Sequence, residues 1–459
     1  MTAEIAILNK TAVALATDSA ITISAGQTEE KIFDSGDKLF ELSCANPIGV
    51  MIYNDLQFAE IPLPIIIKDF RDKCTAVDHV EQAADLFLQY LDELGRTSSS
   101  RVQETSLRRV IDPLLERMDE RFKEAIRRYL LEEKEVEPDE ILDRAFDDVV
   151  RTFETAVQNS QPGEFVGNGA PNFTNEHKKQ VLTGINEYFG NLKPAQKDKI
   201  LGLFREVLLS DYLSSSLTGI VVSGFGTKDV FPTLVAYEVD GVALGRIKKK
   251  SIHRCDIDRD GERASVIPFA QKEMVDRFLY GLDDEIVDEI TSFARRTIST
   301  IGDTIRPNLE FATDDGAEQF ASSVKGAEDE FVSGLKADAF KAIRDKSKQA
   351  IEDIVEFMPK PEVARMAEAL VELTSIKRRV SRGMETVREP IDVAVISRSE
   401  GFIWIKRKHY FEAEFNPRYG ERLAERMRSQ GRKANGRNPR KGKPARKRGQ
   451  TRKSAENSQ

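Results

Sequence analysis

Thr2, the residue that follows Met1, carries a group that can act as a nucleophile. An initiator methionine that precedes a small residue can be removed, and removal would leave Thr2 with both a hydroxyl and a free α-amine. A threonine hydroxyl is too weak an acid to attack an amide unaided, whereas an α-amine with a pKa of about 7.7–8.0 is partly neutral at physiological pH and can accept the proton. One processed residue would then supply both the nucleophile and its base.

The segment after Thr2 is expected to bring other polar groups beside it. Apolar residues alternate in two runs separated by the polar pair Asn9-Lys10, and this pattern predicts an antiparallel hairpin. A two-residue turn at Asn9-Lys10 would pair Thr2 with Thr17 and bring Asp18 to the same end of the ladder. Lys31, in the next segment, is expected to lie between Thr2 and Asp18, where its charge would lower the pKa of the hydroxyl and of the amine.

These residues resemble the proteasome β-subunits, and most closely the bacterial two-component peptidases of the HslV type. The resemblance rests on four features of the sequence, namely Thr2, Ala16–Ala20, Lys31-Ile32 and Gly49–Asn54. In that family a terminal threonine is the nucleophile, an aspartate and a lysine tune it, and a backbone N–H at the end of the glycine-containing strand helps to form the oxyanion hole. The resemblance implies these roles for Thr2, Asp18, Lys31 and the amide of Asn54.

The chain departs from the family pattern at three places. The spacing from Thr2 to Lys31 is a few residues shorter than the family usually shows. Asn54 stands where the family has glycine, although asparagine tolerates a positive φ better than most residues. The Gly-Ser-Gly-type element that supports the nucleophile in the family has no clear equivalent in Ser265–Phe269.

The resemblance implies an α+β fold, a four-layer αββα sandwich of the N-terminal-nucleophile hydrolase type. Two later blocks resemble the family as well: Gly219–Gly226 with Pro232–Gly241, and the closing hairpin Pro390–Ile396 with Gly401–Ile405. Helical periodicity elsewhere predicts large insertions. The expected organisation is a core in three parts (1–97, 194–285 and 360–416), two helical insertions (98–193 and 286–359) and a basic tail (417–459).

The amino-acid composition argues against a membrane-spanning, secreted or metal-binding protein. Of the 459 residues, 40% are hydrophobic and 32% charged, and no run approaches the roughly 18 apolar residues of a membrane span or resembles a secretory signal. The three cysteines are odd in number and scattered, which indicates a reducing, cytoplasmic location. The four histidines lack metal-ligand spacing. We therefore expect no metal, no cofactor and no membrane contact.

The basic tail differs sharply from the rest of the chain. From Arg418 onward it holds 15 Lys and Arg against three Glu, a balance of 15 − 3 = +12, so the total of −8 leaves −8 − 12 = −20 for the remainder. Because it has almost no apolar residues, we expect it to be disordered. A weak electrostatic contact with nucleic acid or an acidic protein is the most that this composition predicts.

Two interpretations of the function follow. The first is a threonine-type peptidase or amidohydrolase that acts through an acyl-enzyme on Thr2 after Met1 is removed. By resemblance, such subunits act on protein or peptide substrates, form homo-oligomeric rings and depend on an ATPase unfoldase for folded substrates. The alternative is a catalytically inactive scaffold or binding protein that keeps the sandwich and works through its helical insertions and basic tail. Retention of Met1 would favour the alternative.

Overall fold

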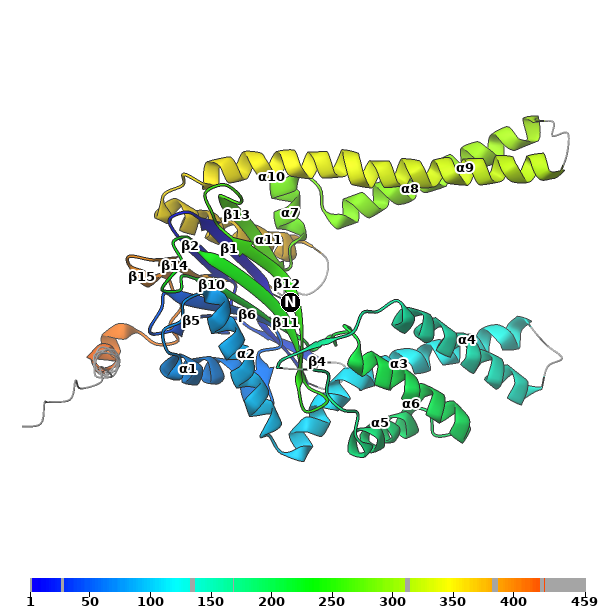
Figure 1. Ribbon diagram of the computed structural model, residues 1–459, viewed down its shortest axis with the longest axis horizontal. Coiled ribbons are helices and arrows are strands. Elements are labelled where there is room, and N and C mark those ends of the chain that lie inside the picture. Colours follow the sequence, from blue (N-terminus) through cyan, green and yellow to red (C-terminus); the bar gives the residue numbers. More distant parts are fainter. Residues whose placement is uncertain are drawn as a thin grey trace, which may run out of the picture. The chain divides into compact units, whose positions relative to one another are not determined.

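The first strand, β1 (Ala3–Asn9), lies inside a five-stranded antiparallel sheet of the computed structural model (Figure 1). The structure describes residues 2–25, 29–132, 137–167, 169–309, 314–381, 387–421 and 425. The strand order is β13-β1-β2-β14-β15. The other strands of this sheet are β2 (Val13–Thr17), β13 (Ala264–Ala270), β14 (Asp392–Ser397) and β15 (Gly401–Lys406). The last two form the closing hairpin expected from the sequence.

A second antiparallel sheet has the order β5-β6-β10-β11-β12-β9. Its strands are β5 (Leu39–Ser43), β6 (Ile48–Asn54), β9 (Glu164–Phe165), β10 (Thr218–Gly224), β11 (Thr233–Val242) and β12 (Ile247–Asp256). The predicted pairing of the two glycine-flanked segments is confirmed as β10 with β11. Two short hairpins complete the described strands: β3 (Ile21–Ala25) with β4 (Glu29–Phe33), and β7 (Gln57–Phe58) with β8 (Ile61–Pro62).

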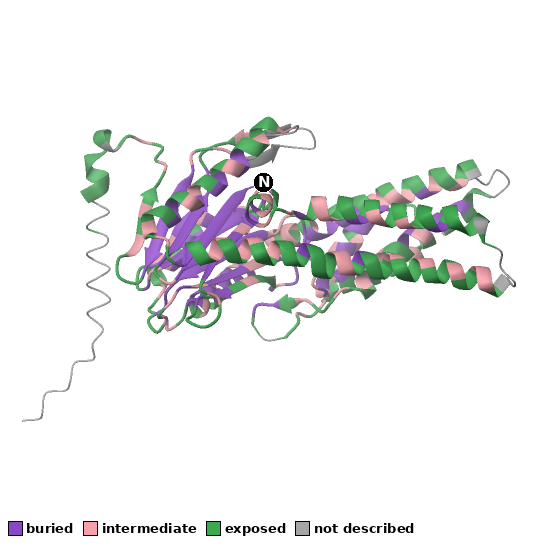
Figure 2. Ribbon diagram, turned by 90° about the horizontal axis from the view of Figure 1, so that it is seen from above, coloured by how far each residue is buried: buried purple, intermediate pink, exposed green. Residues whose placement is uncertain are grey.

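The two large sheets share one apolar core. Leu15 and Phe269 of the first sheet pack in the same buried cluster as Met51 and Leu234 of the second. The outer face of the second sheet is covered by α1 (Leu63–Lys73) and α2 (Val80–Arg96). The predicted apolar face of α2 is buried as expected, including Phe87 and Leu91. Figure 2 shows the buried residues concentrated in the strands.

The outer face of the first sheet is covered by α7 (Glu273–Tyr280) and α11 (Lys360–Val380). Strands β1 and β2 therefore have apolar side chains on both faces, and every residue of both strands is buried. A strand buried on both faces reads as a continuous apolar run with few polar exceptions. The polar exceptions in β1 and just after β2 accordingly need a specific reason.

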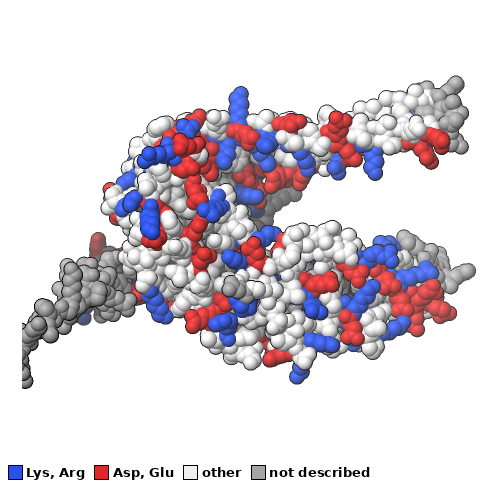
Figure 3. Space-filling view, in the orientation of Figure 1, with Lys and Arg blue, Asp and Glu red and all other residues white. Residues whose placement is uncertain are grey.

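Helices α3 to α6 form a group with its own apolar core. They are α3 (Ser100–Glu132), α4 (Pro138–Gln158), α5 (Asn175–Tyr188) and α6 (Pro194–Leu209). The expected boundary at residue 193 falls between α5 and α6, yet Phe204 of α6 is buried in the same core as Leu115 of α3. The helical group thus continues to Leu209. Acidic and basic side chains are interspersed on its visible surface (Figure 3).

A second helical group follows α7. It consists of α8 (Asp284–Ile305), α9 (Asp314–Gly334) and α10 (Lys341–Val355), together with the short elements η1 (Arg306–Asn308) and η2 (Leu335–Phe340). The C-terminal end of α10 contacts the end of β1, because the Asn9 side-chain amide donates to the carbonyls of Val355 and Met358, each at 3.0 Å. Lys10 and Glu356 add an ion pair of 2.7 Å.

The chain divides into two compact units, Met1–Tyr410 and Phe411–Gln459. A short helix η3 (Ala413–Phe415) lies in the second. The expected disorder of the basic tail concerns residues that, after 421 and apart from 425, lie outside the described part of the chain. No helix in the described ranges is both long and apolar enough to cross a membrane.

Candidate active site

The β1–β2 hairpin brings Thr2 and Asp18 to the same end of the first sheet. Its register pairs Glu4 with Thr17 and Leu8 with Val13. Beyond this ladder the N–H of Asp18 donates to the Ala3 carbonyl at 3.2 Å, and the N–H of Ala3 donates to Asp18 Oδ1 at 3.1 Å. Asp18 is thus fixed beside the residue that follows Thr2.

The predicted turn at Asn9-Lys10 is wrong by one residue. Asn9 pairs with Ala12 through a hydrogen bond of 3.0 Å, and its Oδ1 accepts the N–H groups of Thr11 and Ala12. The two turn residues are therefore Lys10 and Thr11. This moves the strand pairing by two residues, so each side chain keeps the face that the alternation predicted.

Lys38, rather than the expected Lys31, lies between Thr2 and Asp18. Its Nζ donates to Thr2 Oγ1 at 3.1 Å and to Asp18 Oδ1 at 2.8 Å. Lys31 is exposed on β4, where it pairs with Ile23, and this corrects its predicted position. Lys38 instead directly precedes β5, and its carbonyl accepts the N–H of Ile52 in β6 at 2.9 Å.

The Lys38–Asp18 ion pair is taken out of water. Their side chains are 1% and 0% exposed, and Thr2 is 5% exposed. A buried ion pair is tolerable only when its remaining donors and acceptors are satisfied. Asp18 meets this condition because Oδ1 also accepts from Ala3 and Oδ2 accepts from the N–H of Ala20 at 3.0 Å. The three side chains form one connected polar group at the edge of the core.

Glu4 is a further acidic residue close to Lys38 and Asp18. It is fully buried, and neither carboxyl oxygen has a hydrogen-bond partner among the described residues. Burial raises the pKa of Glu4 well above its ordinary value; Lys38 opposes the rise and Asp18 adds to it. Sequence reasoning missed Glu4, although an acid inside an otherwise apolar strand was a visible signal.

Gln271 holds the main chain of Thr2 from the other side. Strand β13 pairs with β1 so that Ala270 lies opposite Ala3, and the N–H of Gln271 donates to the Thr2 carbonyl at 3.1 Å. Arg378 of α11 donates through Nε to Gln271 Oε1 at 2.5 Å. Gln271, which provides this support for Thr2, lies two residues after the Ser265–Phe269 segment in the sequence. Sequence reasoning missed both residues because only the fold brings them to Thr2.

Asn54 ends β6 with a left-handed backbone, φ 68°. Its amide donates to the carbonyls of Ser215 and Leu217, each at 2.9 Å, so the side chain ties β6 to the segment before β10. Within the described residues its side chain makes no hydrogen bond to Thr2, Asp18 or Lys38. The predicted contribution of the Asn54 N–H to an oxyanion hole stays a prediction.

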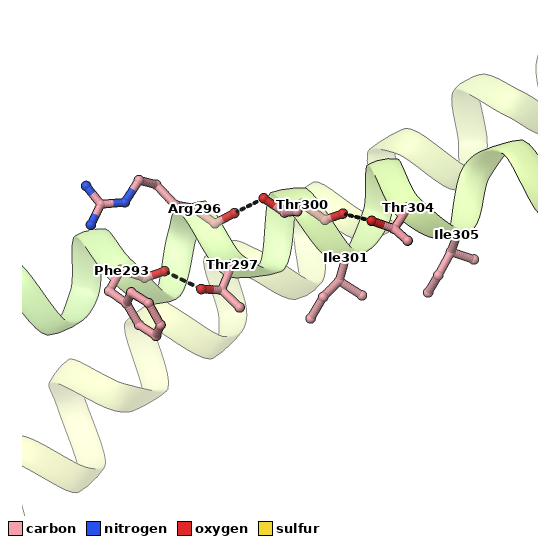
Figure 4. A pocket seen from close by; sticks show the side chains of 7 residues that line it. All are labelled: Phe293, Arg296, Thr297, Thr300, Ile301, Thr304 and Ile305. Atoms are coloured by element: carbon pink, nitrogen blue, oxygen red, sulfur yellow. Dashed lines mark hydrogen bonds between the residues drawn. The ribbon is translucent and has the colours of Figure 1, made fainter.

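A hollow of about 360 Å³ on α8 offers no comparable chemistry (Figure 4). Phe293, Ile301 and Ile305 line it, and Arg296 is the charged residue among its walls. The hydroxyls of Thr297, Thr300 and Thr304 donate to carbonyls of their own helix one turn earlier. No group of three or more potential metal ligands gathers anywhere in the described ranges.

Comparison with known proteins adds little to this geometry. No family model matches the sequence, and no curated protein matches it. Among solved structures the chain is similar to the Gly-1 mutant of Anbu from Hyphomicrobium sp. strain MC1, at 9% identity over 96% of this chain and 100% of that chain, with a TM-score of 0.29. A likeness of this size carries no argument, so the interpretation of the site rests on its own residues.

Proposed function

We propose that the protein is a proteasome-like N-terminal threonine hydrolase, a peptidase that uses Thr2 after removal of Met1. The observation that carries the proposal is the position of Lys38 Nζ, 3.1 Å from Thr2 Oγ1 and 2.8 Å from Asp18 Oδ1, with all three side chains buried. A cation held at this place favours the ionised form of the hydroxyl and disfavours the charged form of a nearby amine. The packing of two sheets between covering helices supports a four-layer αββα sandwich.

The reaction proceeds in two steps. Thr2 Oγ attacks the substrate carbonyl carbon and gives its proton to the Thr2 α-amine; the resulting oxyanion accepts a hydrogen bond from a backbone N–H, for which we propose Asn54. The C–N bond then breaks, the leaving amine takes the proton, and an ester joins the acyl group to Thr2. Water, deprotonated by the same amine, attacks the ester and restores the hydroxyl.

The residues around Thr2 have separate tasks in this scheme. Lys38 stabilises developing negative charge on Thr2 Oγ, and Asp18 holds Lys38 in position through their ion pair. Gln271 fixes the Thr2 carbonyl and so limits the rotation of the main chain that carries the amine. We further propose that the subunits assemble into a homo-oligomer and that an ATPase unfoldase supplies unfolded protein.

Intact-protein mass and covalent labelling test the proposal. The purified protein is expected to lack Met1 and to gain the mass of one β-lactone probe on Thr2. Thr2→Ala should abolish labelling, whereas Thr11→Ala, in the turn of the same hairpin, should label like the wild type. Retained Met1, or equal labelling of Thr2→Ala, would instead support an inactive scaffold of the same fold.

A further inference from the structure

A cavity of about 580 Å³ opens inside the first helical group; its lining includes Leu217, whose carbonyl accepts from the Asn54 amide, but not Thr2, Asp18 or Lys38. Helices α3, α4 and α6 form most of its wall, and the 210–217 segment with strands β11 and β12 closes the rest. Apolar side chains make up much of its lining, among them Phe153, Ala156, Phe204 and Val207. The volume lies in the range of small-molecule sites, roughly 300–1,000 Å³.

Two arginines on the cavity wall have no anionic partner among the residues that the structure describes. Arg117 and Arg121, one helical turn apart on α3, make no ion pair with any carboxylate in the described ranges. Arg121 lies over the Phe153 ring at 5.7 Å, which presents its guanidinium beside the apolar wall. Arg117 is exposed and Arg121 is half-buried, so the N–H donors of both guanidinium groups remain open to an anion that enters the cavity.

The other charged residues of the lining are already occupied. Asp211 accepts from Lys250 at 3.3 Å and from the N–H of Gln161 at 3.1 Å. Glu238 accepts from the Tyr53 hydroxyl at 3.1 Å. Three cations against two acids leave 3 − 2 = +1 for the lining. The charge available to a ligand is therefore positive and lies at Arg117 and Arg121.

A buried lysine holds another part of the cavity wall. Lys248 is 3% exposed, and its Nζ donates to the carbonyls of Tyr212 at 2.7 Å and Val207 at 3.3 Å. Both of these residues line the cavity. Phe204 beside them is 1% exposed and packs in the core of the helical group. The cavity is thus shaped before any ligand arrives, which lowers the entropic cost of binding.

We propose that this cavity binds a small anionic amphiphile, whose apolar body lies against Phe153 and Phe204 and whose carboxylate or phosphate head is held by Arg117 and Arg121. Guanidinium groups bind both kinds of head through paired N–H donors, and an apolar lining favours an apolar body over a free anion. The site goes beyond the proposed hydrolase function, since none of its residues contacts Thr2.

Calorimetry on the full chain tests this site. Dodecanoate and dodecyl phosphate, each below its micelle concentration, identify the preferred head, and dodecyltrimethylammonium controls for the apolar body alone. Saturable 1:1 binding of an anionic probe is expected. The double variant Arg117→Gln/Arg121→Gln should weaken it by roughly tenfold or more, because charge-assisted hydrogen bonds are lost. Arg127→Gln, an exposed arginine of α3 outside the lining, should bind like the wild type.

A second variant separates loss of binding from loss of fold. Ala156 is exposed on α4, so Ala156→Phe should fill the cavity without unfolding the helix, and should abolish binding while the circular dichroism spectrum is retained. Thr2→Ala should bind the probe unchanged, which separates this site from the hydrolase proposal. Equal binding of the cationic amphiphile, unchanged affinity in the double arginine variant, or no saturable binding would each overturn the inference.

Discussion

Lys38 Nζ lies 2.8 Å from Asp18 Oδ1, and neither side chain is more than 1% exposed. The two residues come from different sheets, since Asp18 follows β2 and Lys38 precedes β5. Their contact therefore joins the sheets at the end that holds Thr2. The arrangement leaves Lys38 able to serve both the fold and the hydroxyl.

The two lysines near the first hairpins should differ sharply in activity. Lys38→Met is expected to reduce turnover of a peptide substrate by about 10²-fold or more, because the charge beside Thr2 Oγ1 is lost. Lys31→Ala, which changes an exposed residue of β4, is the matched control and should retain wild-type turnover. Steady-state kinetics check both. The opposite ranking of the two variants would remove Lys38 from the proposed mechanism.

Breaking the buried ion pair should destabilise the protein. Lys38→Met leaves the Asp18 carboxylate without its cation, at a cost of about 3–5 kcal/mol in the free energy of unfolding. The double variant Asp18→Asn/Lys38→Met removes both charges and should recover a large part of that loss while activity stays absent. Urea unfolding of the wild type, the two single variants and the double variant measures the free energies of this double-mutant cycle. Additive effects of the two substitutions would show that the pair is not coupled in the folded chain.

Glu4 should make stability fall as the pH rises. Burial raises its pKa well above the ordinary value of 4.5 in the folded chain. Well below pH 4.5 the carboxyl is protonated in both the folded and the unfolded chain, so its ionisation does not affect stability. Above pH 4.5 the unfolded chain ionises first, and the native state then binds more protons. Stability is therefore lost as the pH rises, until the folded pKa is passed. Glu4→Gln removes this dependence, and its advantage should grow by up to about 1.4 kcal/mol per pH unit in that window.

The control for this effect is the exposed Glu93 of α2. Glu93→Gln should follow the wild-type curve of unfolding free energy against pH, measured by urea titration from pH 4 to pH 8. A constant difference between Glu4→Gln and the wild type across that range would mean that Glu4 titrates alike in the folded and unfolded chains.

Gly219 should not tolerate a side chain. A Cβ at this position would lie 2.0 Å from the Tyr53 ring, which crosses Gly219 to reach Glu238 on the next strand. Gly219→Ala is expected to cost about 1–3 kcal/mol through overpacking. Gly202→Ala on α6, where nothing lies within 4 Å of the added Cβ, should be neutral or stabilising by up to about 1 kcal/mol. Thermal unfolding compares the two; equal melting temperatures would refute the packing account.

Local patterns predicted the strands well because they depend on neighbouring residues. The alternation after Thr2, the paired glycine-flanked strands and the apolar face of α2 all appear as expected. The turn was misplaced because the Asn9 side chain, which replaces a backbone partner for Thr11 and Ala12, has no signature in the spacing of apolar residues.

Contacts between distant elements were beyond the reach of these patterns. Lys31 and Lys38 are the same residue type seven positions apart, and only the pairing of β5 with β6 decides which one faces Thr2. Gln271 reaches Thr2 through the register of β13, more than 250 positions along the chain. The partners of a site assembled from separate strands are fixed by tertiary packing, which single-sequence periodicity does not encode.

The anchoring of α10 to Asn9 makes β1 the link between Thr2 and the second helical group. Thr2 precedes one end of this seven-residue strand and Asn9 closes the other, a span of about 23 Å at the usual rise of a strand. The hydrogen bonds from Asn9 to the Val355 and Met358 carbonyls therefore connect the second helical group to the buried strand whose other end follows Thr2.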